Sequence, residues 1–171
     1  MLRVIGGALL ALTLGSCASV VHDSSTRDLS GAIGRGDLPS VVGYLRDRAD
    51  PNAPDEAGAL PLVSAASWSS PEIVAALLVA GANPNRVSRG ETMTPLLAAA
   101  MRDDKAGAAI ATILLKSGAD PCPRLVREPK PELAHGRFDG KAALEIARLV
   151  GNIDTQSALG PASSGCDWAA G

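Results

Sequence analysis

The sequence predicts an all-α solenoid of stacked helix-turn-helix units with extended loops, from a repeated phrase and from its composition. The phrase occurs three times, as YLRDRADPN (44–52), LLVAGANPN (77–85) and LLKSGADPC (114–122). Its alanines, Ala49, Ala82 and Ala119, recur with a period in the thirties, which is typical of repeat architectures. Aromatic residues make up 2% of the 171-residue chain, so we expect a core of small aliphatic side chains that packs thin elements closely.

Each phrase predicts where a helix ends. An apolar run stops at Gly81 or Gly118, and glycine most easily takes the left-handed conformation that ends a helix. Asn83 and Asp120 can then hydrogen-bond to their own backbone, and the proline after each of them prevents the helix from continuing. Arg48 stands in place of the glycine in the first phrase, where a left-handed conformation is strained by about 1 kcal/mol. We therefore expect a marginal first repeat.

A first helix is predicted upstream of each of the two clearer phrases. The segments LPLVSAA (60–66) and TPLLAAA (94–100) place proline in the first helical turn, where its missing N–H is not needed. Thr94 is a suitable N-cap, whereas Leu60 has no side-chain oxygen, which costs about 1 kcal/mol at that helix start. Each unit is therefore a turn, a short helix, a tight turn, a second helix and a finger, the extended loop that leads to the next unit.

The tight turn between the two helices is predicted from SSPEIV (69–74). Ser69 and Glu72 have the spacing of a capping box, and Pro71 can open the second helix. We therefore expect Ser69 to cap this helix.

These motifs resemble the ankyrin repeat. Its pattern of a G-x-T-P-L start, an Ala-Ala core pair, an E-I-V second helix and a G-A-D/N end appears in 58–85 as GALPL, SAA, PEIV and AGANPN. The resemblance covers 28–160 and implies about four repeats, at 28–54, 55–87, 88–122 and 139–160, with a long loop at 121–139 and a tail at 161–171. The histidine that usually follows T-P-L is absent, since Val63, Leu97 and Glu145 stand there, so we expect a less rigid stack.

Two repeats depart in length from this pattern. The third has about three extra residues at 102–108. The last begins with DGKAALEIARLVGN (139–152), and we expect its second helix to be short, at about 153–159.

The N-terminal residues resemble the signal of a bacterial lipoprotein. Residues 1–16 combine a positive start with an apolar run that is too short to span a bilayer. Leu14-Gly15-Ser16-Cys17 resembles the lipobox, which implies cleavage before Cys17, acylation of its thiol by a fatty acid such as palmitate, and membrane anchoring. Residues 17–27 then form a tether, and Ala18 implies the periplasmic leaflet of the outer membrane. The alternative is an ordinary signal peptide in which Cys17 occurs by chance.

Two cysteines remain after such processing, Cys122 and Cys166. An even pair in an oxidising periplasm predicts a disulfide, which would tie the tail to the third finger and stabilise the fold by up to about 4 kcal/mol. Two unpaired thiols are the alternative. A zinc site from Cys122, His135 and Cys166 is conceivable, but the spacing matches no compact zinc motif, and we expect neither a metal nor a cofactor.

Protein binding without catalysis is the leading functional hypothesis. The formal charge of −2 argues against nucleic acid as a partner, and the sequence has no nucleophile-elbow, phosphate-loop or metalloprotease motif. Stacked helix pairs expose a concave surface that suits protein partners. We therefore expect a monomeric envelope module that inhibits a toxic enzyme, as immunity proteins do, or assists an envelope or secreted enzyme. The rival is a hydrolase that uses the 121–139 loop and His135, whereas His22 is expected to be solvated in the tether.

The residues just before each inter-helix turn are expected to form the binding face. Counted from the aligned first-helix leucines, this position holds Arg35, Trp68, Arg102 and Val150. The full candidate set is Arg35, Glu56, Ala57, Ala59, Ser67, Trp68, Ser88, Arg89, Glu91, Met101 and Arg102. Trp and Arg are enriched among interface hot spots, and the two arginines favour an acidic, partly apolar partner patch. In the alternative, Trp68 folds back over the helix end and covers apolar surface.

Overall fold

The computed structural model describes residues 24–87, 93–122 and 142–166, whose regular elements are helices. These are α1 (Ser24–Gly34), α2 (Leu38–Arg46), α3 (Pro61–Trp68), α4 (Pro71–Val79), α5 (Pro95–Ala100), α6 (Lys105–Lys116), α7 (Ala143–Val150), α8 (Ile153–Leu159) and the 3₁₀ helix η1 (Ala162–Gly165). None of these helices is long and apolar enough to cross a membrane.

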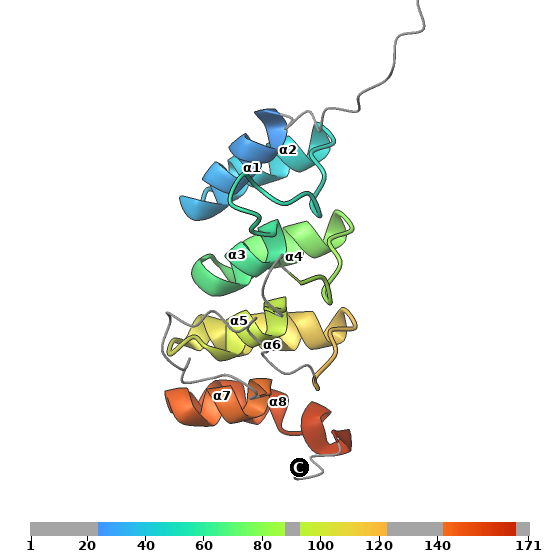
Figure 1. The fold of residues 1–171 in the computed structure, drawn as a ribbon. Helices are drawn as coiled ribbons and strands as arrows, with labels where there is room; N and C mark the ends of the chain where they lie inside the picture. Colours follow the sequence, from blue (N-terminus) through green and yellow to red (C-terminus); the bar gives the residue numbers. More distant parts are fainter. Residues whose placement is uncertain (1–23, 88–92, 123–141, 167–171) are drawn as a thin grey trace, which may run out of the picture.

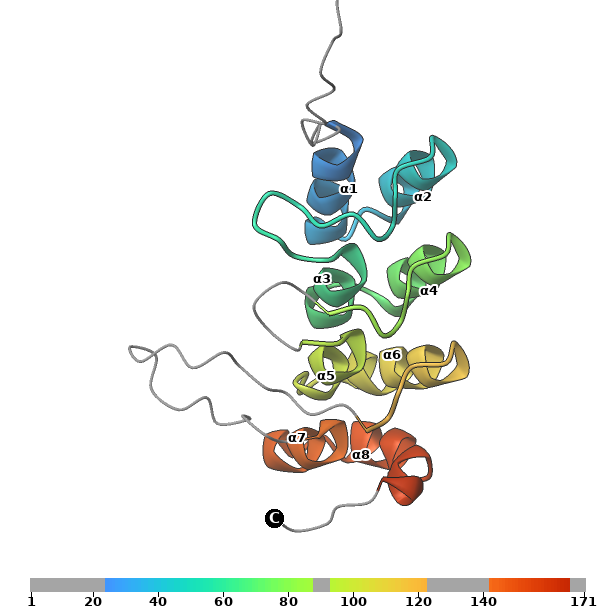
Figure 2. The same cartoon turned by 45° about the vertical axis from the view of Figure 1, so that its right-hand side comes forward.

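The α-helices form four pairs that stack in chain order along one axis (Figure 1). The first helices of the pairs, α1, α3, α5 and α7, contact one another in succession, and so do the second helices, α2, α4, α6 and α8. Figure 2 shows the two rows, and the loop at 47–60 reaching beyond the row of first helices before it enters α3. The predicted all-α solenoid of helix-turn-helix units is confirmed.

One hydrophobic core runs the length of the stack. The side chains of Leu29, Ile73 and Ile146, from three different pairs, are fully buried and belong to a single cluster. Alanines such as Ala65 and Ala99 are also fully buried, and their small side chains let neighbouring first helices approach closely. Each pair therefore buries its apolar face against the next pair, and the solenoid obtains a core that consists mainly of aliphatic side chains.

The helix starts confirm two N-cap predictions and contradict a third. The Thr94 hydroxyl accepts a hydrogen bond from an amide of α5 (3.2 Å), and Leu60 makes no side-chain cap. The N-cap of α4 is Ser70 and not Ser69, because Pro71 takes the first helical position and the cap is the residue before it. Ser69 instead ends α3, and its buried hydroxyl oxygen has no hydrogen-bond partner within the described residues.

The helix ends confirm the predicted turn chemistry. Gly81 and Gly118 have φ angles of 94° and 84°, and Arg48 is the one non-glycine residue of the described ranges with a positive φ, at 67°. The side-chain oxygens of Asn83 and Asp120 each accept the backbone N–H two residues further along, both at 2.9 Å. Arg48 therefore holds the left-handed conformation that was predicted to cost about 1 kcal/mol at this position.

Of two boundaries predicted from the sequence, one agrees with the structure and the other does not. Helix α8 occupies Ile153–Leu159, where a short second helix was expected. Helix α1 begins at Ser24, so residues 24–27, which the sequence assigns to the tether, are already helical. Serine is a common residue at helix starts, so the two serines at 24 and 25 allow the helix to begin upstream of the repeat pattern.

Candidate functional site

Trp68 is the last residue of α3, and its side chain projects into solvent. The residue is 85% exposed, although Ser69 after it is buried. The alternative in which Trp68 folds back and covers apolar surface is therefore wrong. Because the core does not use the indole ring, the ring offers a large amphipathic contact area to another molecule.

The helix residues that the sequence groups with Trp68 differ in exposure. Arg35 is exposed directly after α1. Ser67 is half-buried, and its hydroxyl donates a hydrogen bond to a carbonyl one turn earlier in α3 (2.9 Å). Met101 and Val150 are half-buried and pack against the hydrophobic core, so they contribute to the fold more than to the surface.

The finger residues of the candidate set lie in the loop before α3. Glu56 and Ala57 are exposed, and Ala59 is half-buried. The carboxylate of Asp55 accepts the amide N–H groups of Ala57 and Ala59, both at 2.9 Å, which fixes the shape of the finger tip. The corresponding residues of the next finger, Ser88, Arg89 and Glu91, lie outside the described residues.

Arg102 occupies the position of Trp68 one repeat later, but its side chain is only 12% exposed. Its Nη1 donates to the carbonyl oxygens of Ser69 (3.0 Å) and Ala66 (3.4 Å) at the end of α3. Its Nε donates to one carboxylate oxygen of Asp104 (2.8 Å), and Nη2 to the other. The expectation that Arg102 projects freely toward a partner is therefore wrong, because its planar set of donors is used between neighbouring repeats.

The turn from Arg102 to Asp104 is held from both sides. Asp104 is the N-cap of α6 and accepts the Gly107 amide (3.0 Å), while the Asn152 side chain donates to the carbonyls of Arg102 (3.1 Å) and Asp104 (2.8 Å). The hydrogen bond from Arg102 lowers the pKa of Asp104, so the carboxylate is charged at neutral pH. Because this carboxylate compensates Arg102, Arg35 is the one of these two arginines that still favours an acidic partner patch.

The comparison with known families agrees with this geometry. Residues 57–89 match the family model of the ankyrin repeat, and this range holds α3, α4, the turn between them and parts of the adjoining fingers. The same pair of helices recurs along the stack. The fold is an ankyrin-repeat solenoid. Repeats of this family typically bind other proteins and have no catalytic activity.

The chain is also similar to a protein of Chlamydomonas reinhardtii named "Zygote-specific protein 3". The two sequences are 37% identical over 158 residues. The aligned part covers 92% of this chain and 40% of the relative, so the chain spans less than half the length of that protein.

A disulfide joins Cys122, on the finger of the third ankyrin repeat, to Cys166 after η1, with the Cα atoms 5.6 Å apart. This is the pairing expected from the sequence, and the bonded sulfurs are not available for zinc. Elsewhere in the described ranges, no group of three His, Cys, Asp or Glu side chains is placed to hold a metal ion. His22, His135 and Cys17 lie outside the described residues.

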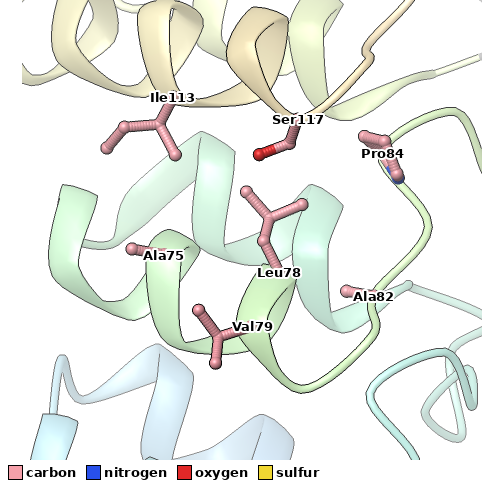
Figure 3. A pocket seen from close by; sticks show the side chains of 7 residues that line it. All are labelled: Ala75, Leu78, Val79, Ala82, Pro84, Ile113 and Ser117. Atoms are coloured by element: carbon pink, nitrogen blue, oxygen red, sulfur yellow. The ribbon is translucent and has the colours of Figure 1, made fainter.

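An apolar groove lies between the second helices of the second and third ankyrin repeats (Figure 3). Its volume is about 280 Å³, and Leu78 and Val79 of α4 and Ile113 of α6 contribute to its lining. None of the described residues that line the groove is charged, so they offer no group for acid, base or ion-binding chemistry.

Sequence reasoning missed two residues that organise the third turn, Asp104 and Asn152. Both are of types preferred at N-caps and stand directly before a helix, so N-cap analysis could have identified them. The bonds from Asn152 cross 48 and 50 residues of sequence, and no local pattern predicts contacts of that separation.

Proposed function

We propose that this chain is a non-catalytic protein-binding module, anchored to a membrane through Cys17 and facing the periplasm. The observation that carries the binding proposal is the 85% exposure of Trp68 at the turn between α3 and α4. Tryptophan is among the residues most enriched at interface hot spots, because one rigid ring buries a large area against a partner. Because the ring is exposed to solvent, it contributes little to the stability of the fold.

The proposed contact surface is the Trp68 edge, which comprises Trp68, Ser67 and Arg35 together with the finger residues Glu56 and Ala57. Besides the exposed ring, this set contains one cation, one carboxylate and small side chains, so it suits a protein patch that is partly apolar. The partner class that we propose is an enzyme of the envelope or a secreted enzyme, which the module inhibits or assists.

The anchoring part of the proposal rests on the sequence pattern around Cys17. Two or more acyl chains hold a protein stably on a bilayer, whereas one chain gives only marginal binding. An anchor at Cys17, close to the start of α1 at Ser24, would keep the repeats near the membrane surface. We propose the periplasmic leaflet of the outer membrane as that surface.

Binding is tested by affinity capture from envelope extract with the soluble Cys17→Ser form. The matched control is Val79→Ala, since Val79 is 90% exposed at the other end of α4 from the Trp68 turn. We expect a stoichiometric partner that is captured by the parent form and by Val79→Ala but lost with Trp68→Ala. Equal capture by all three forms would refute the Trp68 edge.

Anchoring is tested by metabolic labelling with a fatty-acid probe. We expect label on the parent protein and none on Cys17→Ser, which should accumulate in unprocessed or soluble form. Normal labelling of Cys17→Ser would show that Cys17 is not the acylated residue.

A further inference from the structure

The last residue of the repeated phrase occupies one structural position in three successive fingers. It is Asn52 in the first repeat, Asn85 in the second and Cys122 in the third. The two asparagines make the same pair of hydrogen bonds to the following repeat, whereas the cysteine forms a disulfide with Cys166.

The asparagines form the rungs of a ladder between repeats. The Asn52 side chain donates to the Gly81 carbonyl (2.9 Å) and accepts the Asn83 amide (2.8 Å). One repeat later, Asn85 repeats both bonds with the residues that correspond to these two, at 2.9 and 2.7 Å. Each finger is thus held to the next repeat by a two-bond clamp, in which the amide donates to the carbonyl of the left-handed glycine just after the helix.

The register predicts where a third rung has to end. Leu159 follows the N-cap Asn152 at the same distance along the chain as Leu77 follows the N-cap Ser70, and both leucines are fully buried. Carried forward from Leu159, the two residues that an asparagine would bind correspond to positions 163 and 165. Cys166 is the residue directly after them.

We propose that the Cys122–Cys166 disulfide is a covalent third rung of this ladder and a reducible latch that holds the fourth repeat on the third. The bond replaces the two hydrogen bonds of an asparagine rung at the same register. It also differs from them in kind, since thiol chemistry can open it and leave the first two rungs unchanged. This proposal does not depend on the identity of any binding partner.

The latch encloses the whole of the fourth repeat. Cys122 and Cys166 are 44 residues apart in sequence, and α7, α8 and η1 all lie between them. Without the bond, the described contacts that keep this repeat in place are helix packing and the clamp from Asn152. Opening a loop of this length restores chain entropy to the end of the molecule, so the fourth repeat should open far more often than the others.

The opening step needs a dithiol as the reductant. Its thiolate attacks the Sγ of Cys122, which is half-buried whereas Cys166 is buried, and the Cys166 thiolate leaves and takes up a proton. The second thiol of the reductant then attacks the mixed disulfide and releases Cys122. The protein gains two electrons and two protons, and the dithiol becomes a cyclic disulfide.

Hydrogen exchange on the full chain tests the latch, with free thiols counted by alkylation before and after treatment with dithiothreitol under native conditions. We expect two thiols to appear and the exchange of α7 and α8 amides to rise by at least about tenfold, with α1 to α4 unchanged. The Cys122→Ser/Cys166→Ser variant should show the fast exchange with or without the dithiol. Asn85→Ala is the matched control, because it weakens the rung between the second and third repeats. That rung consists of hydrogen bonds, so the effect of its loss on exchange should be the same with and without the dithiol.

Three results would overturn the latch. In the first, no thiols appear under native conditions, so the bond is not reducible in the folded protein. In the second, thiols appear and exchange in α7 and α8 stays the same. In the third, exchange rises evenly through all four repeats, which would make the bond a general stabiliser of the stack.

Discussion

The turns of the second and third repeats place different residues at one equivalent position, and the two side chains behave in opposite ways. Trp68 is 85% exposed, whereas the side chain of Arg102 is 12% exposed. Both stand at the same distance after the aligned leucine of their first helix, Leu62 or Leu96, so repeat register alone would give them one role. The difference shows that repeat register fixes the backbone position of a residue, whereas the hydrogen-bonding groups within its reach determine whether the side chain is buried or exposed.

Those groups are the carbonyl oxygens that α3 leaves free at its C-terminal end. Arg102 reaches the carbonyls of Ala66 and Ser69 from the next repeat, and a cation is favoured at a helix C-terminus. A guanidinium can bind these carbonyls and a carboxylate at once because its five N–H donors lie in one plane. An indole has a single donor, so Trp68 gains little by folding inward and keeps its surface free for a partner.

Arg102→Ala should have the largest effect on stability. It removes charge-assisted bonds that join the second and third repeats, so we expect the free energy of unfolding to fall by about 2–3 kcal/mol. Urea denaturation measures the loss. The stability of Arg102→Lys should fall between those of the parent protein and Arg102→Ala, because lysine keeps the charge but lacks the planar set of N–H donors. A loss below about 0.5 kcal/mol would mean that Arg102 behaves like an ordinary surface residue.

Trp68→Ala should show the converse pattern. We expect binding to the captured partner to weaken by about 2 kcal/mol, because a hot-spot ring is lost. The free energy of unfolding should change by less than about 0.5 kcal/mol, since the ring is not packed in the core. Calorimetric titration and urea denaturation of the same samples separate the two quantities. A large loss of stability with unchanged affinity would reverse the roles assigned to the two turns.

Gly107→Ala tests how closely the Arg102 stem lies against α6. A Cβ at position 107 would come within 3.0 Å of both the Ala99 carbonyl oxygen and the Arg102 Cβ. We expect a net loss of about 1 kcal/mol, because crowding outweighs the gain in helix propensity. Gly43→Ala is the matched control, since nothing lies within 4 Å of its Cβ, and it should gain up to about 1 kcal/mol. Equal gains in urea denaturation would show that α6 can move away.

Asp104→Asn should have the smallest effect. Asparagine still caps α6 but cannot pair with Arg102, and the carboxylate is 49% exposed, so we expect a loss below about 1 kcal/mol. The hydrogen bond from Arg102 holds the folded-state pKa of Asp104 below its usual 3.8. Its contribution is therefore complete above pH 3.8 and is lost as the pH falls through the folded-state value.

The measurement is the free energy of unfolding against pH for the parent protein and Asp104→Asn. Asp37 and Glu72 also have lowered pKa values, from hydrogen bonds with Ser40 and Ser70, so the difference between the two curves isolates Asp104. Curves that stay parallel at acidic pH would show that the Arg102–Asp104 pair adds nothing to stability.

Local chemistry explains which features could be predicted from the sequence. The left-handed positions at Gly81 and Gly118, the strained Arg48 and the Thr94 cap all follow from residues within one turn of each other. The incorrect assignment of Ser69 as the N-cap of α4 was also a local matter. Proline at the first helical position already implied that the residue before it, Ser70, is the cap.

The sequence alone was enough to predict the helix pairs, their ends and the repeat period, because backbone hydrogen bonds and caps join residues at most a few positions apart. It also supplied the cysteine pair and the exposed tryptophan position as candidates. The three-dimensional contacts were needed to show that Arg102 turns inward, that Asn52 and Asn85 clamp the following repeats, and that Cys166 meets Cys122 at the register of a third clamp. These contacts join segments about 30 to 50 residues apart, and only the stacking of the repeats brings them together.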